Sequence, residues 1–89
     1  MSNHQIDTRH LRKGDRVLVT PSPLDHKRWH RAADPNVPGA VWRTVAYTSP
    51  VEARPEMRGW RDVVFTEGGW SSAPRSATFT TDITGRKTQ

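Results

Sequence analysis

The stretch from Gly59 to Trp70 constrains the fold of this chain more than any other segment. It contains a run of β-branched and aromatic residues, then a Gly68-Gly69 pair and a second tryptophan. A strand-forming run followed by a short break with glycine predicts a β-hairpin. The rest of the chain offers further short strands with which this hairpin can pair.

Apolar and polar residues alternate in short segments, which we place at 16–20, 41–48, 60–66, 70–75 and 77–84. Alternation with a period of two predicts strands that turn one face toward a core. Tyr47 is expected to join this core because it shares a strand face with Val45. The side chains expected to meet in a common interior are Val17, Val19, Val45, Val63, Phe65, Phe79 and Ile83.

These five strands, a long first loop and a tight hairpin between the third and fourth strands predict an all-β fold. We expect a small five-stranded SH3-like barrel, since closure removes the exposed edges that an open sheet would leave. An OB-like barrel is the alternative. It usually has a helix between its third and fourth strands, where Gly68-Gly69 leaves no room.

The 89 residues of the chain are enough for one domain. We expect a flexible N-terminal tail at 1–10, a single β-barrel domain at 11–84 and a basic C-terminal tail at 85–89. A long loop occupies 21–40, with the composition for at most one short helical turn between Leu24 and Ala33. Loops of this length are usually functional or mobile.

The net charge of +5 comes from eleven arginines and three lysines against nine acidic residues. A basic balance favours an acidic partner, nucleic acid above all. Because the chain has no cysteine, disulfides and thiolate metal sites are excluded. No apolar run has the length of a membrane span or of a signal-peptide core, so we expect a cytoplasmic protein with no membrane partner.

The segment from Leu11 to Val19 reads Leu-Arg-Lys-Gly-Asp-Arg-Val-Leu-Val. It resembles the first strand of KOW-type and other SH3-like barrels, in which an apolar residue, Gly-Asp and a valine open the barrel. KOW domains continue with glycines, whereas Pro21-Ser22-Pro23 follows here, so the resemblance implies the architecture alone. Small barrels rich in arginine and tryptophan also resemble accessory proteins of actinobacteria and their phages.

The run from Lys27 to Arg31 is the strongest candidate for a binding site. It places cations beside an aromatic ring, the combination that suits a nucleic-acid backbone and a stacked base. The alternative is that Trp29 folds back over the barrel while the charges stay in water. The residues predicted to contact nucleic acid or another partner are Arg12, Lys13, Lys27, Arg28, Trp29, Arg31 and Trp70.

A second basic group is diluted by acidic neighbours. Arg54, Arg58 and Arg61 alternate with Glu52, Glu56 and Asp62, a pattern typical of a neutralised surface.

Metal and cofactor sites find little support in the sequence. His26 and His30 have the spacing of a two-histidine pair on one helix face, and Asp25 or Asp34 could supply a third ligand, but there is no fourth ligand and no cysteine. We therefore predict no metal and no cofactor. The scattered acids and the small barrel interior provide no cleft for acid–base or nucleophilic chemistry, so we also predict no enzymatic activity and no small-molecule substrate.

Two functions remain open from the sequence. The first is a non-catalytic module that contacts DNA or RNA through an Arg/Lys/Trp surface. The second is a protein–protein interaction module, such as a phage accessory protein that binds a host factor or associates with itself. Either fits a monomer or a weak homo-oligomer.

Overall fold

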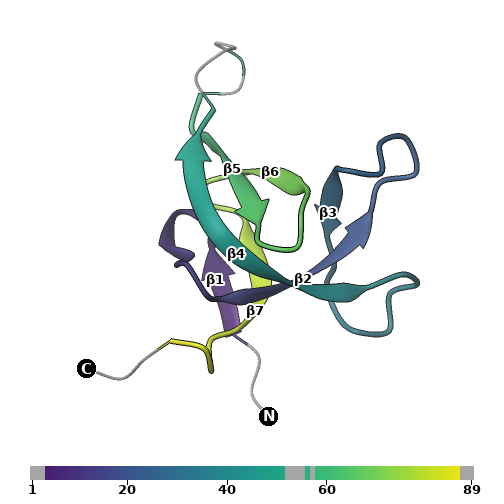
Figure 1. Cartoon of the computed structure of the whole chain (residues 1–89). Helices are drawn as coiled ribbons and strands as arrows, with labels where there is room; N and C mark the ends of the chain where they lie inside the picture. Colours follow the sequence, from purple (N-terminus) through teal and green to yellow (C-terminus); the bar gives the residue numbers. More distant parts are fainter. Residues whose placement is uncertain (1–3, 52–55, 57, 87–89) are drawn as a thin grey trace.

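The computed structural model describes residues 4–51, 56 and 58–86, and within them the chain is all-β (Figure 1). This confirms the all-β part of the predicted fold class. One antiparallel sheet of seven strands runs in the order β1-β7-β2-β4-β5-β6, and β3 pairs with β2 beside this path. The elements are β1 (His4–Asp7), η1 (Thr8–His10), β2 (Arg16–Pro21), β3 (Trp29–Arg31), β4 (Val41–Pro50), β5 (Trp60–Phe65), β6 (Trp70–Pro74) and β7 (Thr78–Asp82).

The sheet curls strongly but does not close, so the closed five-stranded barrel is not what the structure has. The two margins approach each other where β3 meets β6. There a single parallel bridge joins Arg28 to Trp70, and the Trp70 amide donates to the Lys27 carbonyl at 2.9 Å. Regular pairing goes no further along these two strands, which leaves an opening between them.

The segment predicted to hold a helical turn forms β3 instead. The Lys27 amide donates to the Asp25 side chain at 2.9 Å, and the Arg28 amide donates to the Asp25 carbonyl at 3.0 Å. These bonds make a tight turn rather than a helix, because the chain reverses and Trp29 comes to lie opposite Pro21 on β2. The turn chemistry of aspartate therefore outweighs the helical spacing of the neighbouring residues.

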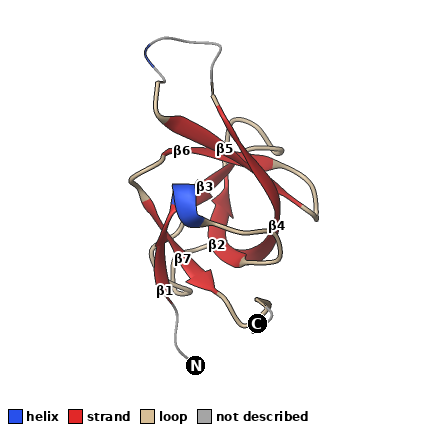
Figure 2. Cartoon of the chain, turned by 90° about the vertical axis from the view of Figure 1, so that its left-hand side faces the viewer, coloured by secondary structure: helices blue, strands red, loops and turns tan. Residues whose placement is uncertain are grey.

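The N-terminal segment also contains regular structure, where the sequence predicted a tail. Gln5 in β1 lies opposite Thr80 in β7, and its side-chain amide donates to the Thr80 hydroxyl at 2.9 Å. The 3-10 turn η1, blue in Figure 2, follows at once. β1 is an edge strand with two exposed residues in four, so its sequence lacks a clear apolar alternation. Residues 1–3 and 87–89 lie outside the described residues.

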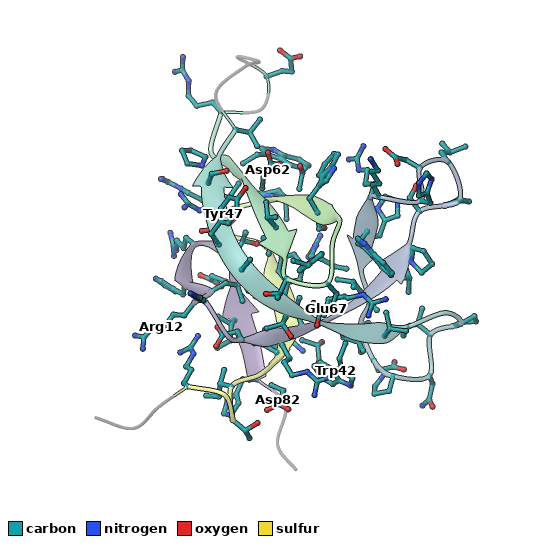
Figure 3. The ribbon with its side chains drawn as sticks, in the orientation of Figure 1. Arg12, Trp42, Tyr47, Asp62, Glu67 and Asp82 are labelled. Atoms are coloured by element: carbon teal, nitrogen blue, oxygen red, sulfur yellow. The ribbon has the colours of Figure 1, made fainter. Side chains whose placement is uncertain are left out.

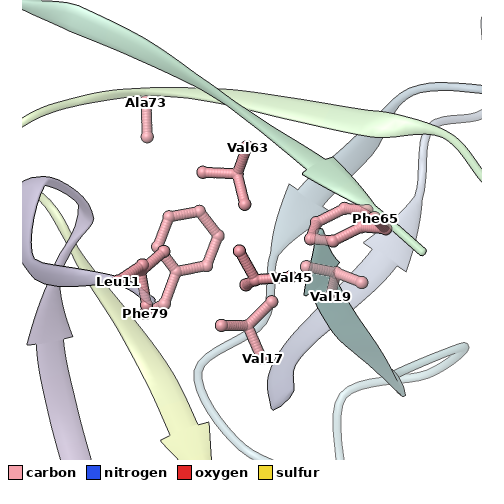
Figure 4. Packing of buried hydrophobic residues seen from close by; sticks show 8 residues of the cluster. All are labelled: Leu11, Val17, Val19, Val45, Val63, Phe65, Ala73 and Phe79. Carbon is pink, nitrogen blue, oxygen red and sulfur yellow. The ribbon is translucent and has the colours of Figure 1, made fainter. Parts of the chain in front are cut away.

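The core forms where the apolar faces of β2, β4, β5, β6 and β7 meet (Figure 4). Six of the seven predicted core residues are buried there, and Leu11 and Ala73 complete the cluster. Ile83 is the exception, since β7 ends at Asp82 and the Ile83 side chain is only half-buried. The cluster is Leu11, Val17, Val19, Val45, Val63, Phe65, Ala73 and Phe79.

The prediction for Tyr47 was wrong, because its side chain is 57% exposed whereas that of Val45 is buried. The register between β4 and β5 shifts at this point. Val45 lies opposite Phe65, but Tyr47 lies opposite Val64, so a β-bulge inserts one extra residue. A bulge reverses which residues face the core, and Tyr47 turns outward (Figure 3).

The C-terminal segment is attached to the sheet through Arg86. Its guanidinium donates to both carboxylate oxygens of Asp15, each at 2.7 Å, and the Asp15 side chain is fully buried. The Asp15 hydrogen bonds raise the pKa of Arg86 above its ordinary value. Within the described part of the chain, no helix is long and apolar enough to cross a membrane.

Candidate functional site

A cleft of about 530 Å³ lies at the opening between β3 and β6. On the β3 side it is lined by Arg28, His30 and Arg31. The opposite wall comes from Trp60 on β5 and from Ser71 and Ser72 on β6. We call this the β3–β6 cleft; β1 and β7 add Gln5, Thr78 and Thr80 to its lining.

The β3–β6 cleft is positively charged. Among the described residues, none of the side chains that line it is acidic. Asp62 lies just beside the cleft and accepts a hydrogen bond from the Ser72 hydroxyl. The Asp62 carboxylate therefore bonds a neighbouring side chain, and the charged residues that line the cleft are Arg28 and Arg31.

Both cleft arginines are held by the sheet. Arg31 donates to the Thr78 carbonyl at 3.1 Å, which ties β3 to β7. The Arg28 guanidinium lies 5.3 Å from the centre of the Trp70 ring, within the range of a cation–π contact. Each guanidinium keeps several N–H donors beyond these contacts, because an arginine carries five. The pair is suited to bind the oxygens of an anion.

The two tryptophans predicted to stack on a base are both half-buried. Trp29 packs against the core and carries the Arg43 guanidinium 4.8 Å from its ring centre. Trp70 is covered in the same way by Arg28. An arginine therefore occupies one face of each ring, and Trp29 serves the packing of β3.

A glycine in the β5–β6 turn makes this packing possible. Gly69 has φ +85°, and a Cβ at this position would collide with the Trp29 indole and lie 2.6 Å from the Lys27 carbonyl oxygen. Only glycine adopts this positive φ without strain and also leaves the space that Trp29 and the Lys27 carbonyl occupy. The β5–β6 turn therefore packs directly against Trp29 at the start of β3.

Glu67 in the same turn supports β4. Its two carboxylate oxygens accept hydrogen bonds from the Thr44 amide and hydroxyl, each at 2.8 Å. Partial burial raises the pKa of Glu67, but these bonds, its own amide and the charge of Arg43 together outweigh burial. The net result is a pKa below the ordinary value of 4.5, so the carboxylate is ionised at neutral pH.

The predicted binding residues do not form one patch. Lys27, Arg28 and Arg31 gather at the β3 end of β2, beside Trp70. Arg12 and Lys13 precede the other end of β2, where Arg12 lies across the molecule from β3 (Figure 3, in the orientation of Figure 1). The six residues of β2 separate the two groups by roughly 20 Å at 3.3 Å per residue.

Several cleft residues were not predicted from the sequence. Trp60 had a usable signal, because it shares strand parity with the outward-facing Val64 rather than with Val63 and Phe65. Ser72 and Gln5 had none, since their place in the cleft depends on the opening of the sheet and on β1. Of the second basic group, Arg54 and Glu52 lie outside the described residues.

The two histidines considered as a metal pair do not share a helix face. His26 lies in the turn before β3, and His30 is in β3 itself. In the part of the chain that the structure describes, no group of three or more metal-ligating His, Cys, Asp or Glu side chains is found.

Comparison of the chain with protein-family models, with curated proteins and with solved structures finds no match.

Proposed function

We propose that this protein is a non-catalytic module that binds nucleic acid at the β3–β6 cleft. The observation that carries the proposal is the convergence of Arg28, Arg31 and an aromatic ring at one concave site without an acidic lining side chain. The guanidinium groups bind phosphate oxygens, and the hydroxyl and amide groups of the lining bind sugar or base edges. The net charge of +5 favours approach of the polyanion.

The proposal includes an architecture. We propose that β2, β4, β5, β6 and β7 correspond to an SH3-like core, to which β1 and β3 are added. Two observations support this. The five strands are consecutive neighbours in the sheet, in the order β7-β2-β4-β5-β6, and the long 21–40 segment connects β2 to β4. The cleft arginines then come from β3, which holds Arg31, and from Arg28 immediately before it.

Fluorescence anisotropy with labelled oligonucleotides tests the proposal. Wild-type protein is titrated at 50 and 200 mM salt, beside two variants that each remove two positive charges, Arg28→Ala/Arg31→Ala and Arg12→Ala/Lys13→Ala. We expect the cleft variant to weaken binding at least about tenfold and to lower the salt slope by roughly 1.4 for a single strand, since each lost phosphate contact accounts for about 0.7. The second variant should change affinity much less.

Two outcomes contradict the proposal. One is the absence of binding to any DNA or RNA at 50 mM salt. The other is an equal loss in both double variants, which would indicate diffuse attraction to net charge rather than a site. Circular dichroism and a melting curve for each variant establish that the fold is retained.

A protein–protein interaction module is the second candidate. It is favoured by two exposed apolar side chains, Leu24 at 95% in the β2–β3 loop and Tyr47 at 57% on β4. In a pull-down from nuclease-treated lysate, this function predicts a partner that survives nuclease and is lost with Leu24→Ser or Tyr47→Ser. If the partner is lost on nuclease treatment, it was held through nucleic acid, which contradicts a direct protein–protein interaction.

A further inference from the structure

A second cleft adjoins the β3–β6 cleft on the other side of Trp60. It has a volume of about 490 Å³ and is lined by Arg58, Gly59, Trp60, Pro74, Arg75 and Ser76. We call it the β5–β6 cleft, because it lies where β5 begins and β6 ends. Trp60 and Pro74 line both clefts, so the two clefts adjoin at these residues.

Trp60 is held in place between the two clefts. It is the first residue of β5 and lies opposite Pro74 on β6. Its carbonyl accepts the Val51 amide at 3.0 Å, and one residue earlier the Gly59 carbonyl accepts the Arg75 amide at 2.9 Å. The indole is half-buried, so part of the ring packs on the sheet while part borders both clefts.

Each cleft is lined by Trp60 and by a pair of arginines. Arg28 and Arg31 line one cleft, and Arg58 and Arg75 line the other. None of the described side chains that line either cleft is acidic. Trp60 therefore has a pair of arginines in the cleft on either hand. Proteins that bind an unpaired strand use this combination, in which cations contact the phosphate backbone and an aromatic ring stacks on a base.

We propose that the two clefts form one track for a single-stranded nucleic acid, with a base stacked on Trp60 and the flanking phosphates on the two pairs of arginines. This inference rests on the proposed function and narrows its substrate class. A duplex fits poorly, because its base faces are covered by neighbouring base pairs and reach Trp60 only after unstacking. The base of a single strand is free to stack without that cost.

The test measures anisotropy with a labelled 15-nucleotide single strand and with a duplex of the same length at the same salt. We expect the single strand to bind at least about tenfold more tightly than the duplex. Trp60→Leu should weaken single-strand binding by about tenfold or more, while Trp60→Phe should restore most of it, because stacking needs a ring and not the indole N–H. Neither variant should change duplex binding appreciably.

The arginines of the β5–β6 cleft provide a second arm. Arg58→Ala/Arg75→Ala should weaken single-strand binding several-fold and lower its salt slope, whereas the matched Arg12→Ala/Lys13→Ala control should not. A melting curve for every variant separates loss of binding from loss of fold. All four of these arginine and lysine positions are exposed, so folding is expected to survive.

The failure of this inference differs from the failure of the proposed function. If no nucleic acid binds at all, the proposed function itself is wrong. If nucleic acid binds and Arg28→Ala/Arg31→Ala weakens it, but duplex and single strand bind equally and Trp60→Leu has no effect, then the track is wrong and the β3–β6 cleft alone is the site.

Discussion

Replacing Arg86 with alanine removes the partner of a fully buried carboxylate. The Asp15 side chain has no exposed surface and accepts two hydrogen bonds of 2.7 Å from Arg86. One further bond remains, from the Arg12 amide at 2.9 Å. The substitution therefore leaves a buried charge with one of its three donors. Leaving such a charge unpaired costs far more than removing a surface pair.

The magnitude follows from these contacts. Removing one partner of a buried ion pair costs about 3–5 kcal/mol, and each charge-assisted bond accounts for roughly 1.5–3 kcal/mol. The Arg86 side chain is 22% exposed, which places the expected loss near the lower limit. We expect the free energy of unfolding to fall by about 3 kcal/mol. For a domain of this size that lowers Tm by roughly 12–24 °C.

Urea unfolding followed by tryptophan fluorescence measures this loss at neutral pH. The Asp15 hydrogen bonds raise the pKa of Arg86 above its ordinary value, so the contribution of Arg86 is fully present at neutral pH and is lost only at strongly alkaline pH. Arginine titration therefore does not complicate the measurement. Arg9→Ala is the matched control, because Arg9 pairs with Asp7 at 3.2 Å and the two side chains are 48% and 29% exposed. It should cost about 0–1 kcal/mol. An Arg86→Ala loss no larger than that of the control would show that the Arg86–Asp15 pair contributes no more than a surface pair.

Three further predictions concern the turn of the β5–β6 hairpin and the β4 bulge. Gly69→Ala should lower the free energy of unfolding by at least about 2 kcal/mol in urea unfolding, because φ is positive and the added methyl collides with Trp29. A loss below about 0.5 kcal/mol, roughly the scatter of surface substitutions, would contradict the close contact between Gly69 and Trp29. The Glu67 carboxylate has a lowered pKa, so its stabilisation is present above pH 4.5 and is lost as pH falls through the folded value. Melting curves should then show a gap between wild type and Glu67→Gln that narrows below that pH, and a constant gap would be evidence against the two bonds from β4. In urea unfolding, Val45→Ala should cost about 2 kcal/mol and Tyr47→Ala well under 1 kcal/mol, because only the Val45 side chain is buried. A larger loss for Tyr47→Ala than for Val45→Ala would contradict a bulge between these two residues.

Much of the sheet could be predicted from local patterns. The hairpin of β5 and β6 follows from a strand-forming run and Gly68-Gly69, and alternation identified Val17, Val19 and Phe79 as core residues. These features depend on residues close together in the sequence, where a two-residue period is a direct signal.

Features that depend on distant segments could not be predicted in this way. The β4 bulge arises from pairing with β5, and nothing near Tyr47 in the sequence marks it. β1 gains its structure from β7, more than seventy residues away at the Gln5–Thr80 contact. The position of β3 depends on the turn at Asp25 and on the pairing of β3 with β2.

The candidate site was predicted in part for the same reason. Arg28 and Arg31 are two of its residues, and both belong to the cluster that the sequence singled out. Trp60, Arg58 and Arg75 reach the site from other strands and turns. Trp60 meets Arg58 and Arg75 through the pairing of β5 with β6, and it meets Arg28 and Arg31 where the sheet stays open between β3 and β6, so the site depends on the assembled fold.

Binding of a single strand along Trp60 can be observed by an NMR titration of ¹⁵N-labelled protein with a short single-stranded oligonucleotide. We expect the largest shift changes at the Trp60 indole and at the amides of Arg31, Ser72 and Arg75, while Lys13 and Gly14 before the other end of β2 stay unchanged. Shift changes centred on Lys13 and Gly14, with Trp60 unmoved, would contradict it.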